Sequence, residues 1–279
     1  MMKMVHKWFI IVYEPSFYSR QRGTDMNKIE LLSDYPYLYE THMHTSEGSK
    51  CGMCPAEDMV RAYKEAGYAG VMVTDHNWGG NTAVDRNLPW EEWLDKFFMG
   101  YHNAKAEGDR IGFPVFLGYE ATQGCGHDFL IYGFTIDWMK KHPELREAGI
   151  PEQYELIHSV GGMVINAHPY READYIDEVL TFEQYADGIE MFNAGHLPHR
   201  EGAADHSIWN EKAVKLANDN NLPGTAGSDQ HSTSLFGGGA AFRTPLRSIE
   251  DYMNRIKNHE DYVLTDGRHW YDNRGHMIK

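Results

Sequence analysis

The chain has 279 residues, which suits either one large α/β barrel or two modest domains. Hydrophobic residues make up 42 % and charged residues 24 %, a globular composition that excludes a mainly disordered chain. The formal net charge of −15 disfavours binding to extended nucleic acid, because the field of the protein would repel a phosphate backbone. A small anionic substrate stays compatible with this charge if bound cations reverse it locally.

The N-terminal region carries no sign of a membrane span or a signal peptide. Its apolar run from Trp8 to Tyr13 is too short for either. Three cysteines without a secretion signal favour a reducing compartment, so we expect a cytoplasmic protein. Residues 1–25 show no clear period, whereas Met26 opens the segment MNKIELL. We therefore expect a non-native leader over residues 1–25 and a single domain over residues 26–279.

Helical and strand-like segments alternate after Pro55. The segment AEDMVRAYKEAG places Met59 and Tyr63 on one side with charges opposite, and Gly67 ends it, which predicts an amphipathic helix. The apolar run AGVMVTDH follows as a strand. The same order recurs, with helices expected over 89–107, 151–160 and 207–218 and strands over FPVFLGYE, HDFLIYGF, GMVINAHP, DGIEMFN, GTAGSDQH and DYVLTDG. This alternation predicts βα units around a mainly parallel sheet.

Potential metal ligands follow these apolar runs where they end. The HMH run follows the strand-like YLYE, and five further runs end in His76, Glu120, His168, Glu190 or Asn193, and Asp229. The carboxyl ends of parallel strands are where α/β barrels and open α/β sheets build their active sites. We therefore expect one barrel-like domain whose polar residues gather at one mouth.

Two pairs of residues have the spacing that lets both side chains reach one ion. His42 and His44 lie at positions i and i+2, which project from the same face of a strand, and Asp229 and His231 repeat this spacing. Asp75 and His76 are adjacent and would point to opposite faces. We expect His76 to be a ligand and Asp75 to orient a ligating imidazole through its other nitrogen.

Three more residues extend this set of donors. Glu120 ends an apolar strand, where a charged carboxylate needs a partner such as a metal ion. His127 begins the next strand and His168 lies in NAHP, and each taken singly is equally consistent with a hydrogen-bonded loop histidine. The whole set offers nitrogen and oxygen donors, which suit Zn²⁺, Mn²⁺ or Fe²⁺, and it exceeds the needs of one ion.

The motifs also resemble a known family. In order, YETHMHTS, VMVTDHN, GYEAT, GHDFLIYGF, NAHPYR, GIEMFN and AGSDQHS are similar to the motifs of the polymerase-and-histidinol-phosphatase (PHP) family, over roughly residues 38–265. The similarity is greatest to the stand-alone bacterial PHP phosphoesterases. It implies an α/β fold, a distorted (β/α)7 barrel of TIM-like type, with two or three divalent ions at the carboxyl ends of the strands.

The resemblance also implies how these residues share the ions. One ion would be held by His42, His44, Glu120 and Asp229, a second by Glu120 with His127 and His168, and a further position by His76 and His231. Members of the family place another His or Asp a few residues after H-x-H, but this chain reads TSEGSKCGMC there. Met53 or a neighbour stands at that position, with Glu47, Ser49 and Cys51 as alternatives, so two ions are expected and a third is left open.

These expectations lead to a metal-dependent phosphoesterase or phosphatase, a phosphoric ester hydrolase. A hydroxide held between two ions would attack the phosphorus of a small phosphate ester, because metals lower the pKa of bound water. Glu120, Asp229 and Asp75 are the expected catalytic residues. Arg171, in HPYR, is a candidate phosphate fork and Arg243 a second one, although either arginine would equally suit an ordinary surface.

Three other readings stay open. A C–N hydrolase of amidohydrolase type also uses H-x-H, but those enzymes often bridge their metals with a carboxylated lysine where this chain has a glutamate. A nuclease is disfavoured by the net charge, and a non-catalytic metal-binding scaffold is disfavoured by the number of ligands retained. The expected partner is a small phosphorylated substrate, with no extended nucleic acid and no membrane. Histidinol phosphate, a nucleotide, a sugar phosphate or a cyclic phosphodiester would all suit it, and the oligomeric state is not predicted.

Overall fold

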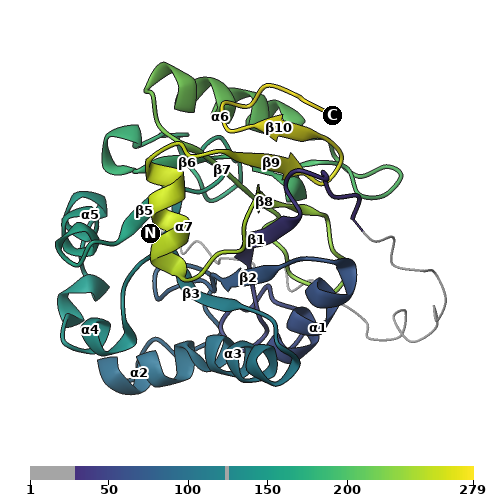
Figure 1. Ribbon diagram of the computed structural model, residues 1–279. Coiled ribbons are helices and arrows are strands. Elements are labelled where there is room, and N and C mark those ends of the chain that lie inside the picture. The colour runs from purple at the N-terminus through teal and green to yellow at the C-terminus, as the bar shows by residue number, and fades with distance from the viewer. Residues whose placement is uncertain (1–28, 123–125) are drawn as a thin grey trace.

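A computed structural model describes residues 29–122 and 126–279. The expected leader, Met26 and Cys125 lie outside these ranges. Ten strands of the described residues form one curled sheet, with helices around it (Figure 1). The strands are β1 (Tyr37–Met43), β2 (Gly70–Val73), β3 (Val115–Thr122), β4 (Asp128–Tyr132), β5 (Met163–Asn166), β6 (Gly188–Asn193), β7 (Gly224–Gly227), β8 (Gly238–Phe242), β9 (Tyr262–Asp266) and β10 (Trp270–Asp272).

The helices cover the sheet between these strands (Figure 1). They are α1 (Ala56–Ala66), α2 (Trp90–Phe97), α3 (Met99–Ile111), α4 (Ile136–Lys140), α5 (Ile150–Ser159), α6 (Ser207–Asp219) and α7 (Ile249–Lys257). Helix α1 has the buried face predicted for it and ends at Gly67, whose φ of 96° is left-handed. The single helix expected over 89–107 is two helices, α2 and α3, which meet at Phe98.

The strand order is β10-β9-β8-β1-β2-β3-β4-β5-β6-β7, and its directions are mixed. Strands β1, β2 and β3 run parallel, as do β5, β6 and β7. Strand β4 is antiparallel to both β3 and β5, and β8 is antiparallel to β1 and β9. The mixed α/β fold is confirmed, but the expectation of a mainly parallel sheet is wrong.

The short connection between β3 and β4 explains one reversal of direction. Only residues 123–127 join these strands, whereas a parallel crossover needs about a dozen residues or more. Between β5 and β6 the chain forms a 3-10 turn at Glu183–Tyr185 and no α-helix. The described elements therefore do not repeat as seven regular βα units, and the fold is a curled half-barrel related to the TIM type.

The curl brings the chain after β7 back onto β1. The backbone N–H of His44 donates to the carbonyl of Gln230 at 2.8 Å, and the N–H of Gln230 donates to the carbonyl of His42 at 3.1 Å. The Thr41 hydroxyl donates to the carbonyl of Ala226 at 2.7 Å. These bonds place the carboxyl ends of β1 and β7 side by side. His44 and Asp229, which are 185 positions apart in the sequence, therefore face one another.

None of the helices in the described ranges combines the length and apolar character needed to cross a lipid bilayer.

Candidate metal centre

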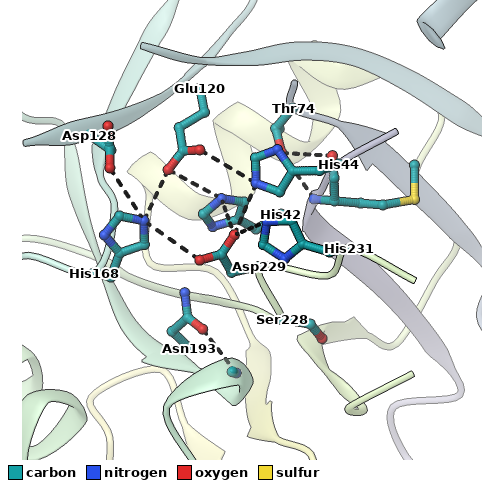
Figure 2. Close-up of polar contacts among 12 residues, drawn as sticks. His42, His44, Thr74, Glu120, Asp128, His168, Asn193, Ser228, Asp229 and His231 are labelled. Atoms are coloured by element: carbon teal, nitrogen blue, oxygen red, sulfur yellow. Dashed lines mark hydrogen bonds and ion pairs between the residues drawn. The ribbon is translucent and has the colours of Figure 1, made fainter. Parts of the chain in front are cut away.

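Eight acidic and histidine side chains converge at the carboxyl ends of β1, β2, β3, β5 and β7 and at the start of β4, and Figure 2 labels all of them except His76. We call this set the His–carboxylate cluster. Figure 2 shows the imidazoles of His42, His44 and His168 turned toward the carboxylates of Glu120 and Asp229. The members of the cluster are His42, His44, His76, Glu120, Asp128, His168, Asp229 and His231.

Glu120 lies at the centre of the cluster and is fully buried. Its Oε1 is 2.9 Å from His168 Nε2 and 3.4 Å from His42 Nε2. Its Oε2 is 2.8 Å from His76 Nδ1 and 3.4 Å from His44 Nε2. Burial alone would raise the pKa of Glu120, but the facing His76 and His42 hold it well below its usual range. The ionised carboxylate thus offers each of its oxygens to a different pair of imidazoles, as a bridging ligand would.

Asp229 faces the same imidazoles from the other side. Its Oδ1 is 2.9 Å from His44 Nε2, 3.5 Å from His42 Nε2 and 3.7 Å from His231 Nε2. Burial opposes ionisation, but His42 and His231 hold the pKa of Asp229 well below its usual range. Burial and the neighbouring His76 lower the pKa of His44 to about 3. His44 is therefore neutral at pH 7, which is the state in which an imidazole binds a metal.

Two residues of the cluster have left-handed backbone conformations. His168 has a φ of 31° and Asp229 a φ of 52°. Residues other than glycine seldom adopt positive φ, although aspartate and histidine do so more readily than most. Each of the two lies two residues beyond the end of its strand, β5 or β7. The chain therefore bends sharply at these two points, which brings both side chains into the cluster.

Glu190, on β6, fixes the orientation of His42. His42 Nδ1 donates to Glu190 Oε1 at 2.9 Å. Burial opposes ionisation of Glu190, but the facing His42 holds the pKa of Glu190 below its usual value, so the carboxylate is an acceptor. The other oxygen of Glu190 accepts from the backbone N–H of His168 at 3.0 Å and from the Asn193 side chain at 3.0 Å. His42 Nε2 is left to face Glu120 and Asp229. This arrangement is typical of carboxylates that lie behind metal-binding histidines.

Asp75 acts on a different histidine from the one expected. The Ser49 hydroxyl donates to Asp75 Oδ1 at 2.7 Å and lies 3.2 Å from His44 Nδ1. Asp75 also accepts from the backbone N–H and the hydroxyl of Thr45 at 2.7 and 2.6 Å. Since the Ser49 proton is directed to Asp75, its oxygen is free to accept from Nδ1 of His44. The expected catalytic role of Asp75 is corrected to a positioning role, exerted on His44 through Ser49 rather than on His76.

His127 does not join the cluster. Its Nε2 lies 3.0 Å from the carbonyl of Glu178 and 3.2 Å from the backbone N of Leu180, and its ring packs edge-on against Phe182. The next residue, Asp128, is buried and lies in the cluster instead, with its Oδ2 3.9 Å from His168 Nε2. Successive residues of a strand point to opposite faces, so only one of the two can reach the cluster. The structure therefore places Asp128 in the cluster instead of the expected ligand His127.

The two candidate arginines have different positions. Arg171 forms an ion pair with Asp128, and its Nη1 is 3.9 Å from Asp229 Oδ2. Its guanidinium therefore lies beside two carboxylates of the cluster. Arg243 instead pairs with Asp261 and lies over the ring of Tyr35 on the exposed surface. The expectation that Arg243 binds substrate is therefore corrected, since its guanidinium is held away from the cluster.

Cys51 is the residue of the loop after H-x-H that reaches the cluster. Its thiol lies with donor atoms of His44, His76 and His231 within 4.8 Å of one another. Burial opposes ionisation, but hydrogen bonds with His231 and His76 bring the pKa of Cys51 down to about 7. The alternatives point elsewhere. Glu47 accepts from the first N–H of α1 at 3.2 Å, Ser49 is bonded to Asp75, and the Met53 side chain is 65 % exposed.

Comparisons with known proteins found one family match and several similar folds. Residues 207–260, which include Asp229 and His231, match the family model described as PHP-associated. The fold is similar to that of a two-domain protein from Bacteroides vulgatus containing a predicted PHP-like metal-dependent phosphoesterase. That structure is 15 % identical, and the match covers 88 % of this chain and 69 % of that one with a TM-score of 0.62. Both findings support the resemblance to the PHP family that the sequence motifs show.

A second solved structure with a similar fold is PsfC from Pseudomonas syringae. It is 16 % identical, and the match covers 77 % of this chain and 87 % of that one with a TM-score of 0.51. No curated protein matches the chain. At these identities the solved structures establish the fold of the chain, and its chemistry has to be argued from the site.

The His–carboxylate cluster suits divalent metal ions. Three of its buried atoms, His42 Nε2, His76 Nδ1 and Glu120 Oε2, have no hydrogen-bond partner, although all belong to groups that point into the cluster. Buried polar atoms without partners are costly, and a metal ion would satisfy them. Several sets of three donors lie close enough to hold one ion, such as His42, His44 and Glu120, or His76, Glu120 and Asp128. Imidazole and carboxylate donors of this kind suit Zn²⁺, Mn²⁺ or Fe²⁺.

Proposed function

We propose that this protein is a metal-dependent hydrolase of the PHP type that cleaves a small phosphate ester. The observation that carries the proposal is the pairing of two ionised carboxylates, the buried Glu120 and the partly exposed Asp229, across the same imidazoles. Such a set can hold two ions that share Glu120. Divalent ions bound there would supply Lewis acidity to a phosphoryl oxygen and a nucleophile at neutral pH.

The residues around the ions have distinct tasks in this proposal. Glu190 and the Ser49–Asp75 pair hold His42 and His44 with Nε2 directed inward. Fixed imidazoles keep the donor atoms in place during turnover, which is the usual contribution of groups behind metal ligands. Arg171 supplies a permanent positive charge next to Asp128 and Asp229, and its guanidinium suits the oxygens of a phosphoryl group.

The exposed side of the cluster supports a small substrate. The side chains of His42, His44 and Glu120 are fully buried, whereas those of Asp229, Arg171 and His231 are 16, 21 and 29 % exposed. A substrate would therefore reach the ions past these last three groups. We propose a small phosphorylated substrate and no extended nucleic acid or membrane partner, because the net charge of −15 disfavours both polyanionic surfaces.

A reconstitution experiment tests the proposal. The protein is stripped with a chelator, reloaded separately with Mn²⁺, Zn²⁺ or Fe²⁺, and assayed on a panel of phosphate monoesters, phosphate diesters and amide substrates. We expect release of phosphate or cleavage of a diester with at least one metal. Glu120→Gln should abolish this activity, whereas Glu147→Gln, at an exposed position, should retain it. Turnover of amides alone, or no turnover of any phosphate ester by metal-loaded protein, would overturn the proposal.

A further inference from the structure

One group at the exposed edge of the cluster has no role in the proposed chemistry. Cys51 is a free thiol of intermediate exposure, and its sulfur lies within 4.8 Å of donor atoms of both His76 and His231. A thiol that only fills space would be surrounded by apolar side chains. Cys51 is instead surrounded by imidazoles, which are themselves metal-binding groups.

The ring of His44 lies between the rings of His76 and His231, the two histidines near the thiol. Its ring stacks on His76 with centroids 4.5 Å apart and on His231 with centroids 4.6 Å apart. Both of its nitrogens are already engaged, Nδ1 with Ser49 and Nε2 with Asp229. Among the four donors that lie together, His44 is therefore directed to the carboxylate side. Cys51, His76 and His231 are the three that remain for one ion.

His76 provides the second observation that points to an ion. It is only 8 % exposed, and its Nδ1 atom has no hydrogen-bond partner although it lies 2.8 Å from Glu120 Oε2. A donor atom of His76 also lies within 4.8 Å of the Cys51 sulfur, so its ring joins the carboxylate side of the cluster to the thiol. A deeply buried imidazole with an unpartnered nitrogen, between a carboxylate and a thiol, is well placed to bind a cation.

We propose that the Cys51 thiol is a metal ligand in this chain. It would complete, with His76 and His231, the further position that the family resemblance implies, in place of the His or Asp of other members. Three protein ligands leave a fourth position open to solvent or substrate, as in catalytic zinc sites. A thiolate is a softer donor than a carboxylate, so this position favours Zn²⁺, Fe²⁺ or Co²⁺ over Mn²⁺ and Mg²⁺. The inference rests on the proposed metal dependence but is independent of which bond the enzyme cleaves.

The absorption spectrum of the Co²⁺-loaded protein tests this assignment without an activity assay. A cobalt–thiolate bond gives a charge-transfer band in the near ultraviolet that imidazole and carboxylate ligands do not give. We expect the wild-type protein to develop this band on titration with Co²⁺ and Cys51→Ser to lose it completely. Cys54→Ser is the matched control, because Cys54 lies in the same loop but its sulfur is near the Thr233 hydroxyl, 4.0 Å away. This variant should keep the full band.

Alkylation of the unmodified chain gives a second readout that does not depend on the folding of a variant. Zn²⁺ should protect Cys51 from iodoacetamide and leave the labelling of Cys54 unchanged. Mass spectrometry with tandem fragmentation of the peptide that contains both cysteines measures the label at each of them. No charge-transfer band in the wild type, a band that survives in Cys51→Ser, or equal labelling of Cys51 with and without Zn²⁺ would each overturn the assignment. If the cobalt band appears but no phosphate ester is cleaved, the metal site stands and only the proposed function fails.

Discussion

The Nδ1 atom of His42 donates a hydrogen bond to Glu190 at 2.9 Å, and this contact turns Nε2 of His42 toward Glu120 and Asp229. Glu190 is buried on β6 and also accepts from the backbone N–H of His168. One carboxylate therefore positions a donor from β1 and a donor that follows β5. The cluster depends on this second layer as much as on the groups that face its centre.

Glu190→Gln should weaken metal binding while leaving the direct donors in place. An amide is uncharged and can present its NH₂ group to Nδ1, so it no longer holds His42 in one tautomer. We expect the affinity for the tightest-bound ion to fall by about 10–100-fold, as is usual for such outer groups. Competition with a fluorescent chelator measures this change. Glu201→Gln, at an exposed position, should leave the affinity unaltered, and a Glu190→Gln protein with wild-type affinity would contradict the assigned role.

Ser49→Ala should have a similar effect through His44. The hydroxyl of Ser49 connects Asp75 to His44 Nδ1, and without it the imidazole loses the contact that directs Nε2 inward. We expect metal affinity to fall by roughly 10-fold. Ser46→Ala is the control, since Ser46 is exposed and its hydroxyl donates to the neighbouring Glu47. Equal affinities for the Ser49 and Ser46 variants, measured by the same competition, would remove Ser49 from the account.

Asp128→Asn and His127→Ala together test which residue of β4 faces the ions. The structure directs Asp128 into the cluster and His127 to the backbone of Glu178 and Leu180. Asp128→Asn should lower the metal content and the turnover. His127→Ala should keep both, and the loss of its backbone contacts should cost about 1 kcal/mol of stability at most. The reverse pattern, with metal lost from the His127 variant only, would show that the strand register is different.

Arg171→Ala should raise KM for a phosphate ester. A hydrogen bond to a charged group contributes about 1.5–3 kcal/mol, which corresponds to roughly 10–100-fold in KM. Steady-state kinetics under saturating metal measures the change, and metal content should be determined alongside because Arg171 also contacts Asp128. Arg243→Ala is the matched control, since its guanidinium pairs with Asp261 on the surface. An unchanged KM in the Arg171 variant would exclude it from substrate binding.

Much of the site could be predicted because it lies at strand ends. His42, His44, His76, Glu120, His168, Asp229 and His231 all follow or end apolar runs, and the structure brings all of them together. The i, i+2 spacing of His42 and His44 is a local property of a strand and is visible in the sequence. The helix α1 was predictable for the same reason, since its buried face and its terminal Gly67 are local signals.

The remaining parts depend on contacts that no local pattern encodes. The choice between His127 and Asp128 depends on strand register, and a shift of one residue exchanges the faces of a strand. The connection over residues 123–127 is too short for a parallel crossover, so its length indicates that β4 is antiparallel to β3. Cys51 lies near His76 and His231 because backbone hydrogen bonds close the loop that carries it. The N–H of Ser46 donates to the carbonyl of Cys54, and the N–H of Met53 donates to the carbonyl of His231. Such long-range closure leaves no periodicity in the sequence.

The metal content of the protein tests the central claim most directly. Protein purified without chelator and protein reloaded with Zn²⁺, Mn²⁺ or Fe²⁺ are analysed for each element, with melting temperatures recorded in parallel. We predict at least two ions per chain for the wild type, and a lower content for Glu120→Gln and Asp229→Asn in variants that remain folded, because each of these carboxylates faces several donors. A reproducible content of zero or one ion in the wild type after reloading with every metal would contradict the account.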